Sequence, residues 1–387
     1  MRDRRKRPRI KTRVVFEGGL IMMLLRMGSL NAQEDTKGNR FWKKWIGDVL
    51  PSADTTGKVF AKIYAENVRE INRQIYSRQK RNKALNGSVQ GLRFLIVDCH
   101  EQHTSYLCRC NLCCERKIGE GKKERIQYYH RNVTAMLVCG ERWILLDSEM
   151  QRRGEDEVGC AMRLLERVME KYNRAFDVVA GDGLYVQGRF FNFAVRHGKD
   201  VVAVLKDDRR DLMKDAMGIF KTIKPEEETR KKLYRQMWDM DGFTSWEGFG
   251  KPVRVVRSLE TKTIRRQMNK KEEKITSDWV WATTLPKWKA STRTVVKIGH
   301  RRWAIENEGF NELVNAWHAD HIYKHDPNAI DVFWLTLMIA YNLFNAFIEL
   351  NLKPEIRRGR SRKYWALVIA SELYATEFTC AGDYSGP

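Results

Sequence analysis

Residues 92–98 read Leu-Arg-Phe-Leu-Ile-Val-Asp, and residues 176–182 read Phe-Asp-Val-Val-Ala-Gly-Asp. Each stretch is a short apolar run that ends in an acid, which is typical of a buried strand with a charge at its carboxyl end. A third apolar run follows at 201–205. A predicted hairpin at 133–146 and helical spacing of the apolar residues over 155–172 complete the unit. This order predicts an α/β fold in which helices flank a mixed sheet.

The rest of the chain divides into regions of different character. Residues 1–90 contain short helical segments rich in basic residues, which predicts a helical DNA-binding region, with a purely structural helical cap as the alternative. Residues 207–289 are charged and strand-prone in pieces, which indicates a β-rich insertion. It separates the two parts of the α/β domain, 91–206 and 290–350. Residues 351–387 form a basic C-terminal tail.

The charge balance points to a polyanionic partner. The chain has 71 Lys and Arg against 49 Asp and Glu, a formal net charge of +22 at pH 7. Such a field favours DNA or RNA, although a merely basic soluble protein is the alternative. Lys80 and Arg81 lie in a basic cluster that ends the N-terminal region, and we expect them to contact DNA. Hydrophobic residues make up 43% of the chain, which excludes a disordered protein.

One apolar segment is a candidate membrane span. Residues 333–350 are mostly apolar, but polar and charged residues interrupt them and the uninterrupted run is shorter than the usual span of about 20 residues. The apolar run 20–25 follows a basic N-terminus as in a signal peptide, but Arg26 ends it early. The sequence therefore predicts a buried helix at 333–350 and no association with a membrane.

Five of the eight cysteines lie close together in the sequence. This crowding indicates a metal site or reduced thiols in a cytoplasmic protein rather than disulfides. Cys110 and Cys113 have the C-x2-C spacing of half a zinc site, and His100, His103 or His130 can complete it. Free thiols in a loop are the alternative.

Three acids have positions that packing does not explain. Asp98 and Asp182 each follow a buried strand, at the edge where open sheets bind ligands. Glu306 falls in the middle of an apolar helical face, four residues after Arg302, and a simple Arg302–Glu306 salt bridge is the structural alternative. Clusters of carboxylates suit Mg²⁺ or Mn²⁺, and a pair of such ions about 4 Å apart is the usual apparatus of phosphodiester chemistry. In a basic protein, this cluster points to cleavage and transfer of DNA strands.

The same residues resemble the DDE triad of prokaryotic insertion-sequence transposases. The resemblance rests on Asp98, on Asp182 in Val-Val-Ala-Gly-Asp-Gly-Leu-Tyr, and on Glu306 in Arg-Arg-Trp-Ala-Ile-Glu-Asn-Glu-Gly-Phe-Asn-Glu-Leu. It covers roughly residues 14–352. The first two acids are 84 residues apart and the last two are 124 apart, which leaves room for the β-rich insertion found in one branch of this family.

The resemblance implies the fold, the chemistry and the partners. It implies an RNase H-like catalytic domain in which Asp98, Asp182 and Glu306 are catalytic and hold two Mg²⁺ or Mn²⁺ ions. The expected activity is cleavage at the ends of a mobile element and strand transfer into target DNA. The expected partners are terminal inverted repeats, target DNA and a second copy of the chain, in a cytoplasmic, nucleoid-associated complex.

The helix signature of the family matches this chain only in part. Its pattern is Y-x2-R-x3-E-x6-K, and Arg302 and Glu306 match it, whereas Gly299 replaces the Tyr and Leu313 replaces the Lys. The resemblance implies that Arg302 contacts the DNA end. Trp303 can stack on a flipped base, with plain packing as the alternative.

Two other functions fit the same residues. One is a metal-dependent nuclease that does not transfer strands. The other is a catalytically inactive transposase remnant that binds DNA as a repressor.

Overall fold

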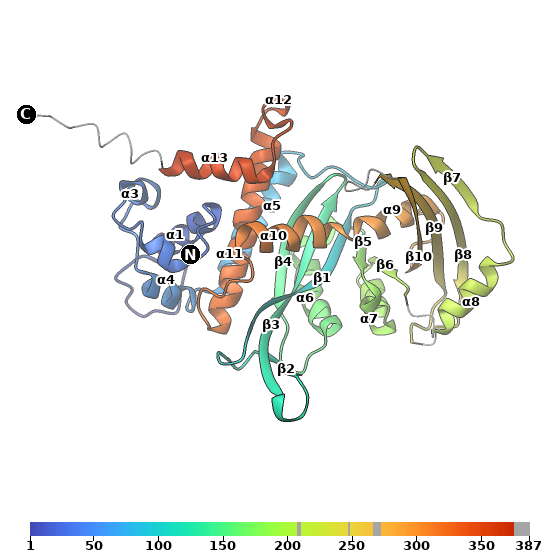
Figure 1. Ribbon diagram of the computed structural model, residues 1–387, viewed down its shortest axis with the longest axis horizontal. Helices are drawn as coiled ribbons and strands as arrows, with labels where there is room; N and C mark the ends of the chain where they lie inside the picture. Colours follow the sequence, from blue (N-terminus) through green and yellow to red (C-terminus); the bar gives the residue numbers. More distant parts are fainter. Residues whose placement is uncertain (207–209, 247, 266–271, 375–387) are drawn as a thin grey trace, which may run out of the picture.

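The structure is a computed structural model that describes residues 1–206, 210–246, 248–265 and 272–374 (Figure 1). Parts of the predicted insertion and of the predicted tail lie outside these residues. The described chain contains an N-terminal group of helices, a large sheet with helices on both faces, and a C-terminal pair of helices.

Ten strands form the sheet. They are β1 (Phe94–Ser105), β2 (Cys114–Ile118), β3 (Arg125–Cys139), β4 (Arg142–Met150), β5 (Val178–Gly181), β6 (Asp200–Val204), β7 (Glu226–Arg230), β8 (Leu233–Phe243), β9 (Val253–Arg265) and β10 (Glu272–Thr283).

The helices alternate with these strands in the middle of the chain and stand alone at its two ends. The α-helices are α1 (Thr12–Leu24), α2 (Leu30–Glu34), α3 (Arg40–Ile46), α4 (Ala53–Phe60), α5 (Ala65–Arg81), α6 (Glu157–Tyr172), α7 (Gly188–Arg196), α8 (Asp211–Phe220), α9 (Thr292–Arg301), α10 (Asn311–Trp317), α11 (Pro327–Ala346), α12 (Pro354–Arg357) and α13 (Arg362–Tyr374). Shorter turns are η1 (Gly121–Lys123), η2 (Asn173–Ala175), η3 (Gly183–Tyr185), η4 (Ile305–Phe310) and η5 (Phe347–Asn351).

The strand order confirms the predicted mixed sheet. The central part runs β4-β3-β1-β5-β6, in which β4, β3 and β1 pair antiparallel and β1, β5 and β6 pair parallel. This combination of an antiparallel meander and parallel crossovers agrees with the RNase H-like expectation. The strands of the predicted insertion continue the same sheet, because β10 pairs antiparallel with β6 and is followed by β9, β8 and β7.

Alternation along the strands divides the core into two layers. Phe94 and Ile96 of β1 face a core shared with the helical segments 292–317 and 327–346. Leu95 and Val97 face the opposite core, which α6 and α7 cover. Because a strand turns successive side chains to opposite faces, each face of β1 buries its own set of apolar residues.

The predicted N-terminal helical region is confirmed. Helices α1, α4 and α5 pack against α11, and α5 also packs against β4. The segment 327–351 is the one described helix long and apolar enough to cross a membrane, and 78% of its apolar window is buried inside the protein. Its apolar surface is therefore covered by protein, as the sequence predicted.

Two predictions about individual elements need correction. The first strand does not end at Asp98, because β1 continues to Ser105 against the long strand β3, which supplies partners as far as Tyr128. A bulge interrupts this pairing between Gln102 and Thr104. The helical segment predicted to carry Glu306 is not uniformly α-helical, because η4 is wound as a π-helix between α9 and α10.

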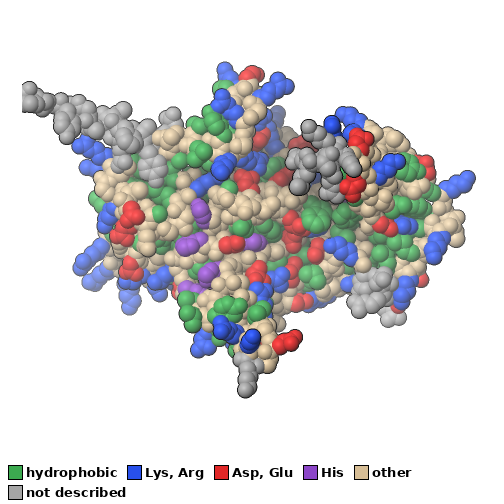
Figure 2. All heavy atoms as spheres, viewed as in Figure 1, with side chains coloured by type: hydrophobic (Ala, Val, Ile, Leu, Met, Phe, Trp, Pro, Cys, Tyr) green, Lys and Arg blue, Asp and Glu red, His purple; other side chains and the backbone are tan. Residues whose placement is uncertain are grey.

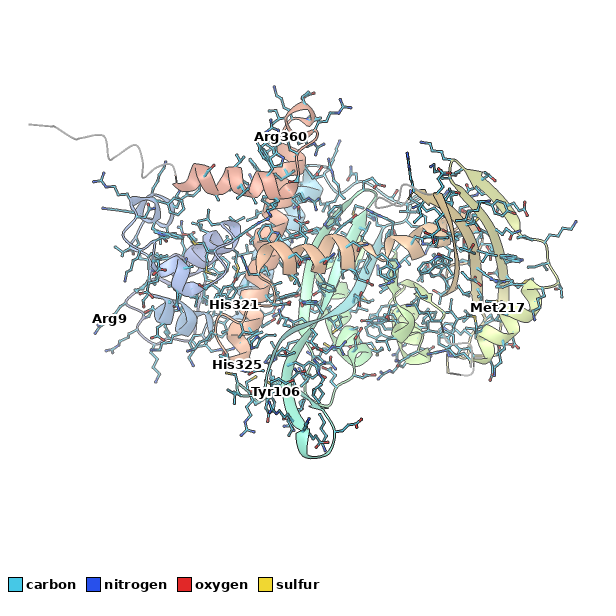
Figure 3. The ribbon with its side chains drawn as sticks, viewed as in Figure 1. Arg9, Tyr106, Met217, His321, His325 and Arg360 are labelled. Atoms are coloured by element: carbon cyan, nitrogen blue, oxygen red, sulfur yellow. The ribbon has the colours of Figure 1, made fainter. Side chains whose placement is uncertain are left out.

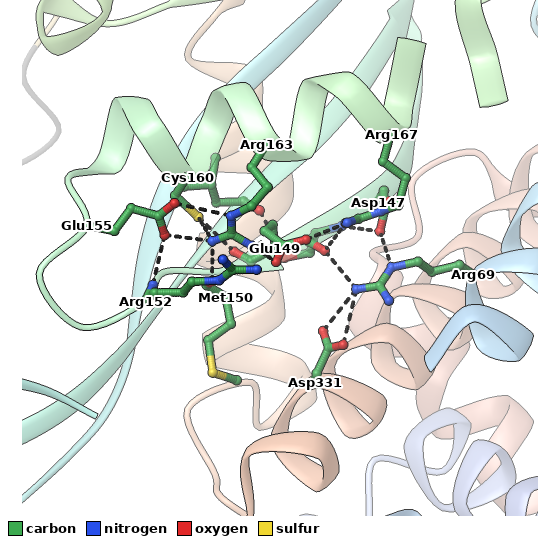
Figure 4. Close-up of polar contacts among 12 residues, drawn as sticks. Arg69, Asp147, Glu149, Met150, Arg152, Glu155, Cys160, Arg163, Arg167 and Asp331 are labelled. Carbon is green, nitrogen blue, oxygen red and sulfur yellow. Dashed lines mark hydrogen bonds and ion pairs between the residues drawn. The ribbon is translucent and has the colours of Figure 1, made fainter. Parts of the chain in front are cut away.

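A buried ionic network joins the N-terminal region to the sheet (Figure 4). Arg69 of α5 contacts Asp147 of β4 at 3.0 Å and Asp331 of α11 at 3.1 Å. Arg167 of α6 contacts Asp147 at 2.6 Å and Glu149 at 2.5 Å. The side chains of Arg69 and Asp147 are 13% and 4% exposed, so each charge depends on its partners rather than on water.

We expect Arg69→Met to lower the free energy of unfolding by about 3 kcal/mol or more, because it leaves the carboxylates of Asp147 and Asp331 without a shared cation. Arg13→Met is the matched control, since Arg13 pairs with Glu17 on the surface and that pair contributes at most about 0.5 kcal/mol. Urea denaturation of the two variants checks this. Equal losses would show that the network does not stabilise the fold.

Candidate active site

The pairing of β1 with β5 aligns two of the predicted acids. The parallel register pairs Ile96 with Ala180. Asp98 and Asp182 each lie two residues beyond this pair, so both fall on the face of the sheet occupied by Ile96 and Ala180. The same face packs against the helical segment that carries Glu306. The structure therefore brings all three predicted acids to one face.

A tight turn after β5 fixes Asp182. The Asp182 carboxylate caps η3 by accepting a hydrogen bond of 2.8 Å from the backbone N–H of Leu184. The buried Tyr185 donates its hydroxyl to Glu157 of α6 at 3.0 Å, which anchors the turn. Residue 181 must be Gly here, because a Cβ atom would lie 2.8 Å from the Tyr185 ring.

The helix that carries Glu306 packs closely on the sheet. A Cβ atom at Gly299 would lie 2.2 Å from Nε1 of Trp281 in β10, so no larger side chain fits there. Leu313 is fully buried in the core. Gly299 and Leu313 are the positions that depart from the family helix signature. Core side chains fill the space at both positions, so neither is open to a ligand.

Arg302 lies between two of the acids. Its Nη1 atom donates to Oε1 of Glu306 at 2.8 Å and to Oδ2 of Asp98 at 3.4 Å. The Arg302 side chain is only 2% exposed, whereas Glu306 is 36% exposed. Glu306, which belongs to the π-helical turn of η4, is therefore partly exposed rather than buried within the predicted apolar face.

Burial dominates the electrostatics at Asp98. Burial, together with the nearby charges of Asp182 and Glu306, raises the pKa of Asp98 to about 7, although the Cys99 N–H and Arg302 oppose this shift. The carboxyl is held in a region that disfavours additional negative charge. A bound cation would relieve this cost, which is how a divalent-ion site behaves.

A cavity of about 560 Å³ opens beside Asp98 and Glu306. Its lining continues through His100, which contacts Asp320 at 2.8 Å and stacks on the ring of Phe310. Three amides at four-residue spacing line the same cavity. They are Asn307, Asn311 and Asn315. Sequence reasoning missed these amides as site residues, although their regular spacing on one helical segment was a usable signal.

Of the remaining predicted DNA contacts, Trp303 lies beside Arg302, whereas Lys80 and Arg81 lie apart from the acids. Trp303 is half-buried, with its ring edge-on to Trp279 and beneath the guanidinium of Arg302. Lys80 and Arg81 are exposed at the C-terminal end of α5. The structure thus brings Arg302 and Trp303 to the site and leaves Lys80 and Arg81 on another element. Their contact with DNA remains a prediction.

A second cluster contains the predicted cysteines. Cys110, Cys113, His130 and His325 place their ligand atoms within 4.8 Å of one another. His130 was among the predicted partners, whereas His325 was missed because it lies 212 residues after Cys113. Neither His100 nor His103, the other two predicted partners, belongs to this group.

Two of the four ligand residues, Cys113 and His130, are buried, and Cys110 and His325 are half-buried. Burial lowers the pKa of His130 to about 4, so its imidazole is neutral at pH 7. Burial also raises the pKa of Cys113 to about 11. The seven cysteines within the described residues are all free.

Comparison with known families identifies the central part of the chain. Residues 161–343 match the family model described as the transposase DDE domain. The match includes Asp182 and Glu306 and begins after Asp98. No curated protein sequence matches the chain. The predicted resemblance to DDE transposases is thereby confirmed, whereas an origin in an insertion sequence stays a prediction.

The raised pKa of Asp98 predicts a pH-dependent effect of Asp98→Asn on the metal-free protein. In the wild type, the folded state keeps the Asp98 proton up to about pH 7, whereas the unfolded chain loses it near pH 4. The wild type therefore loses stability as the pH rises through this window, and the Asn variant does not. We therefore compare the free energy of unfolding of Asp98→Asn with that of the wild type. We expect this difference to favour the variant more at pH 8 than at pH 5, by about 1 kcal/mol or more. Urea denaturation in chelator at both pH values measures it, and an equal gain would contradict it.

Proposed function

We propose that this chain, which carries a transposase DDE domain at residues 161–343, is a DNA transposase whose catalytic residues are Asp98, Asp182 and Glu306. The observation that carries the proposal is the convergence of these three carboxylates on one face of the sheet, beside an open cavity. The proposed reaction is cleavage at the ends of an insertion sequence, followed by transfer of the freed strand into target DNA.

The donor atoms of the site suit Mg²⁺ or Mn²⁺. Asp98, Asp182 and Glu306 offer only carboxylate oxygens, which are the ligands these ions prefer. The raised pKa of Asp98 indicates negative charge that lacks sufficient compensation from the protein alone. Two such ions, when bound, activate the attacking water or 3′-OH and stabilise the leaving oxygen.

The protein residues supply position and an access route. Asp182 is held by its backbone cap and by the anchored turn behind it. Arg302 acts as a positioning residue, because it fixes the Glu306 carboxylate and reaches Asp98 from a fully packed site. The cavity beside them is open to solvent, and its amide lining offers donors and acceptors to a DNA backbone.

Basic side chains provide the surface for DNA. Figure 2 shows Lys and Arg over the N-terminal helices and over the C-terminal helices. Others lie on the projecting arm that β2 forms with the first part of β3, called the β2–β3 arm below. Lys80 and Arg81 belong to the exposed basic side chains of the N-terminal region. These groups would neutralise phosphates and make binding strongly dependent on salt. Terminal inverted repeats and target DNA are the proposed ligands, bound by a homodimer in the cytoplasm at the nucleoid.

Two assays separate this function from its alternatives. A supercoiled plasmid nicked in the presence of Mg²⁺ excludes an inactive DNA-binding repressor. Joining of precleaved ends to a target then excludes a nuclease that does not transfer strands. DNA binding without nicking would support the repressor, and nicking without joining would support the nuclease.

We expect Glu306→Gln to retain DNA binding and to lose both nicking and joining, because the amide keeps the shape of the side chain but removes the charge that holds a cation. Glu308→Gln is the matched control, since Glu308 lies in the same helical turn and pairs with Arg301 outside the acid cluster. Nicking and joining assays with Mg²⁺ compare the two variants. Cleavage by Glu306→Gln at the wild-type rate would remove Glu306 from the site.

We expect Arg302→Ala to reduce strand transfer about tenfold or more, equivalent to about 1.4 kcal/mol, with nonspecific DNA binding unchanged. The reason is loss of the contact that orients Glu306 and Asp98. Arg301→Ala serves as the control, because Arg301 contacts Glu308 and a backbone carbonyl instead. The concentration of Mg²⁺ needed for half-maximal joining should also change only in Arg302→Ala. Full activity of the folded Arg302→Ala protein at the same Mg²⁺ requirement would contradict this role.

A further inference from the structure

Two cysteine and two histidine side chains lie together where the β2–β3 arm joins the rest of the sheet. Cys110 and Cys113 come from the loop between β1 and β2, and His130 comes from β3. His325 comes from the loop between α10 and α11, which follows the helical segment that carries Glu306. Figure 3 shows His325 beside the β2–β3 arm, and its ring centroid lies 5.8 Å from that of His130. Three segments distant in the sequence thus supply one cluster.

The separations between the ligand atoms fit a tetrahedral metal site. The two sulfur atoms are 3.6 Å apart, and Nε2 of His130 lies 3.4 Å from the Cys110 sulfur and 3.3 Å from the Cys113 sulfur. Nε2 of His325 lies 3.7 Å from the Cys113 sulfur. In a tetrahedral site, zinc bonds of about 2.3 Å to sulfur and about 2.0 Å to nitrogen place two sulfur atoms about 3.8 Å apart and a sulfur and a nitrogen atom about 3.5 Å apart. These four separations are close to those edges, and all the ligand atoms lie within 4.8 Å of one another.

Neither a disulfide nor a histidine buried by packing alone accounts for these contacts. A disulfide between Cys110 and Cys113 requires sulfur atoms about 2.05 Å apart, so the observed pair is not bonded. His130 is 1% exposed, and its Nδ1 atom is buried without a hydrogen-bond partner among the described residues. Its polar contacts are therefore made by the other ring nitrogen, and these are with thiols. The backbone N–H of Cys110 donates to the Cys113 sulfur at 3.1 Å, an arrangement that stabilises a thiolate.

We propose that Cys110, Cys113, His130 and His325 bind a structural zinc ion that ties the β2–β3 arm to the loop before α11. A set of four protein ligands is closed and leaves no position for a substrate, which distinguishes a structural from a catalytic zinc site. The sulfur and nitrogen donors select zinc, whereas the oxygen cluster at Asp98 selects Mg²⁺ or Mn²⁺. The two sites take different ions and are loaded independently.

The zinc ion stabilises the fold by closing a long loop. Cys113 and His325 are 212 residues apart, and the segment between them contains most of the sheet. A metal ion that closes such a long loop reduces the conformational entropy of the unfolded chain more than a metal ion that closes a short loop does. The loop that carries His325 also contains Asp320, which contacts His100, and both of these residues line the cavity beside Asp98. The ion therefore fixes the connection between α10 and α11.

Metal analysis of the full purified chain tests the proposal. We expect one equivalent of zinc per chain, and we expect Co²⁺ in its place to give the visible absorption of a tetrahedral site with two thiolates. Cys113→Ser and His325→Ala should each lower zinc affinity at least tenfold. Cys108→Ser and His103→Ala are the matched controls and should retain zinc, because both residues are exposed and lie outside the cluster, Cys108 in the same β1–β2 loop and His103 in β1.

Hydrogen exchange of the wild-type protein provides a readout that does not depend on folded variants. Removal of zinc by a chelator should increase exchange in residues 107–114 and 318–326, with β9 unchanged. Purified protein that contains no zinc and binds no Co²⁺ would overturn the proposal. Zinc affinity that is unchanged in His325→Ala, or lost equally in Cys108→Ser, would also overturn it.

Discussion

The parallel pairing of β1 with β5 is the constraint on which the site depends. Because Ile96 lies opposite Ala180, Asp98 within β1 and Asp182 just after β5 lie at the same height and on the same face. A shift of one residue in either strand would turn one carboxylate to the opposite core, where α6 and α7 pack. The apolar residues that alternate along both strands hold this register, so ordinary packing determines where the charges meet.

Arg302 makes the resulting concentration of acids compatible with a folded protein. Carboxylates gathered at the edge of an apolar core repel one another and lose hydration. A guanidinium that is 2% exposed and contacts both Glu306 and Asp98 offsets part of that cost. The compensation is incomplete, as the raised pKa of Asp98 shows. The fold therefore retains a deficit of positive charge at the place where a cation is proposed to bind.

The sequence was informative where the signal was local. The apolar runs at 92–98 and 176–182 predicted two central strands, and the motifs around Asp182 and Glu306 predicted the family. The length of β1 was not predictable, because its second half exists only through pairing with β3. The π-helical turn at Glu306 and the partner His325 were also missed. The contact of His325 with Cys113 joins distant segments, which spacing within one segment does not record, and a π-helical turn departs from the α-helical periodicity by which the sequence was interpreted.

The close approach of Gly299 to Trp281 has a consequence for how such proteins diverge. The indole of Trp281 fills the space that any side chain at residue 299 would need. The two positions are therefore coupled in size, although one lies on the helical segment before Glu306 and the other on the last strand of the insertion. A tyrosine at residue 299 therefore requires a smaller side chain at residue 281. This volume limit links the size of a residue in β10 to that of a residue on the helical segment that carries Glu306.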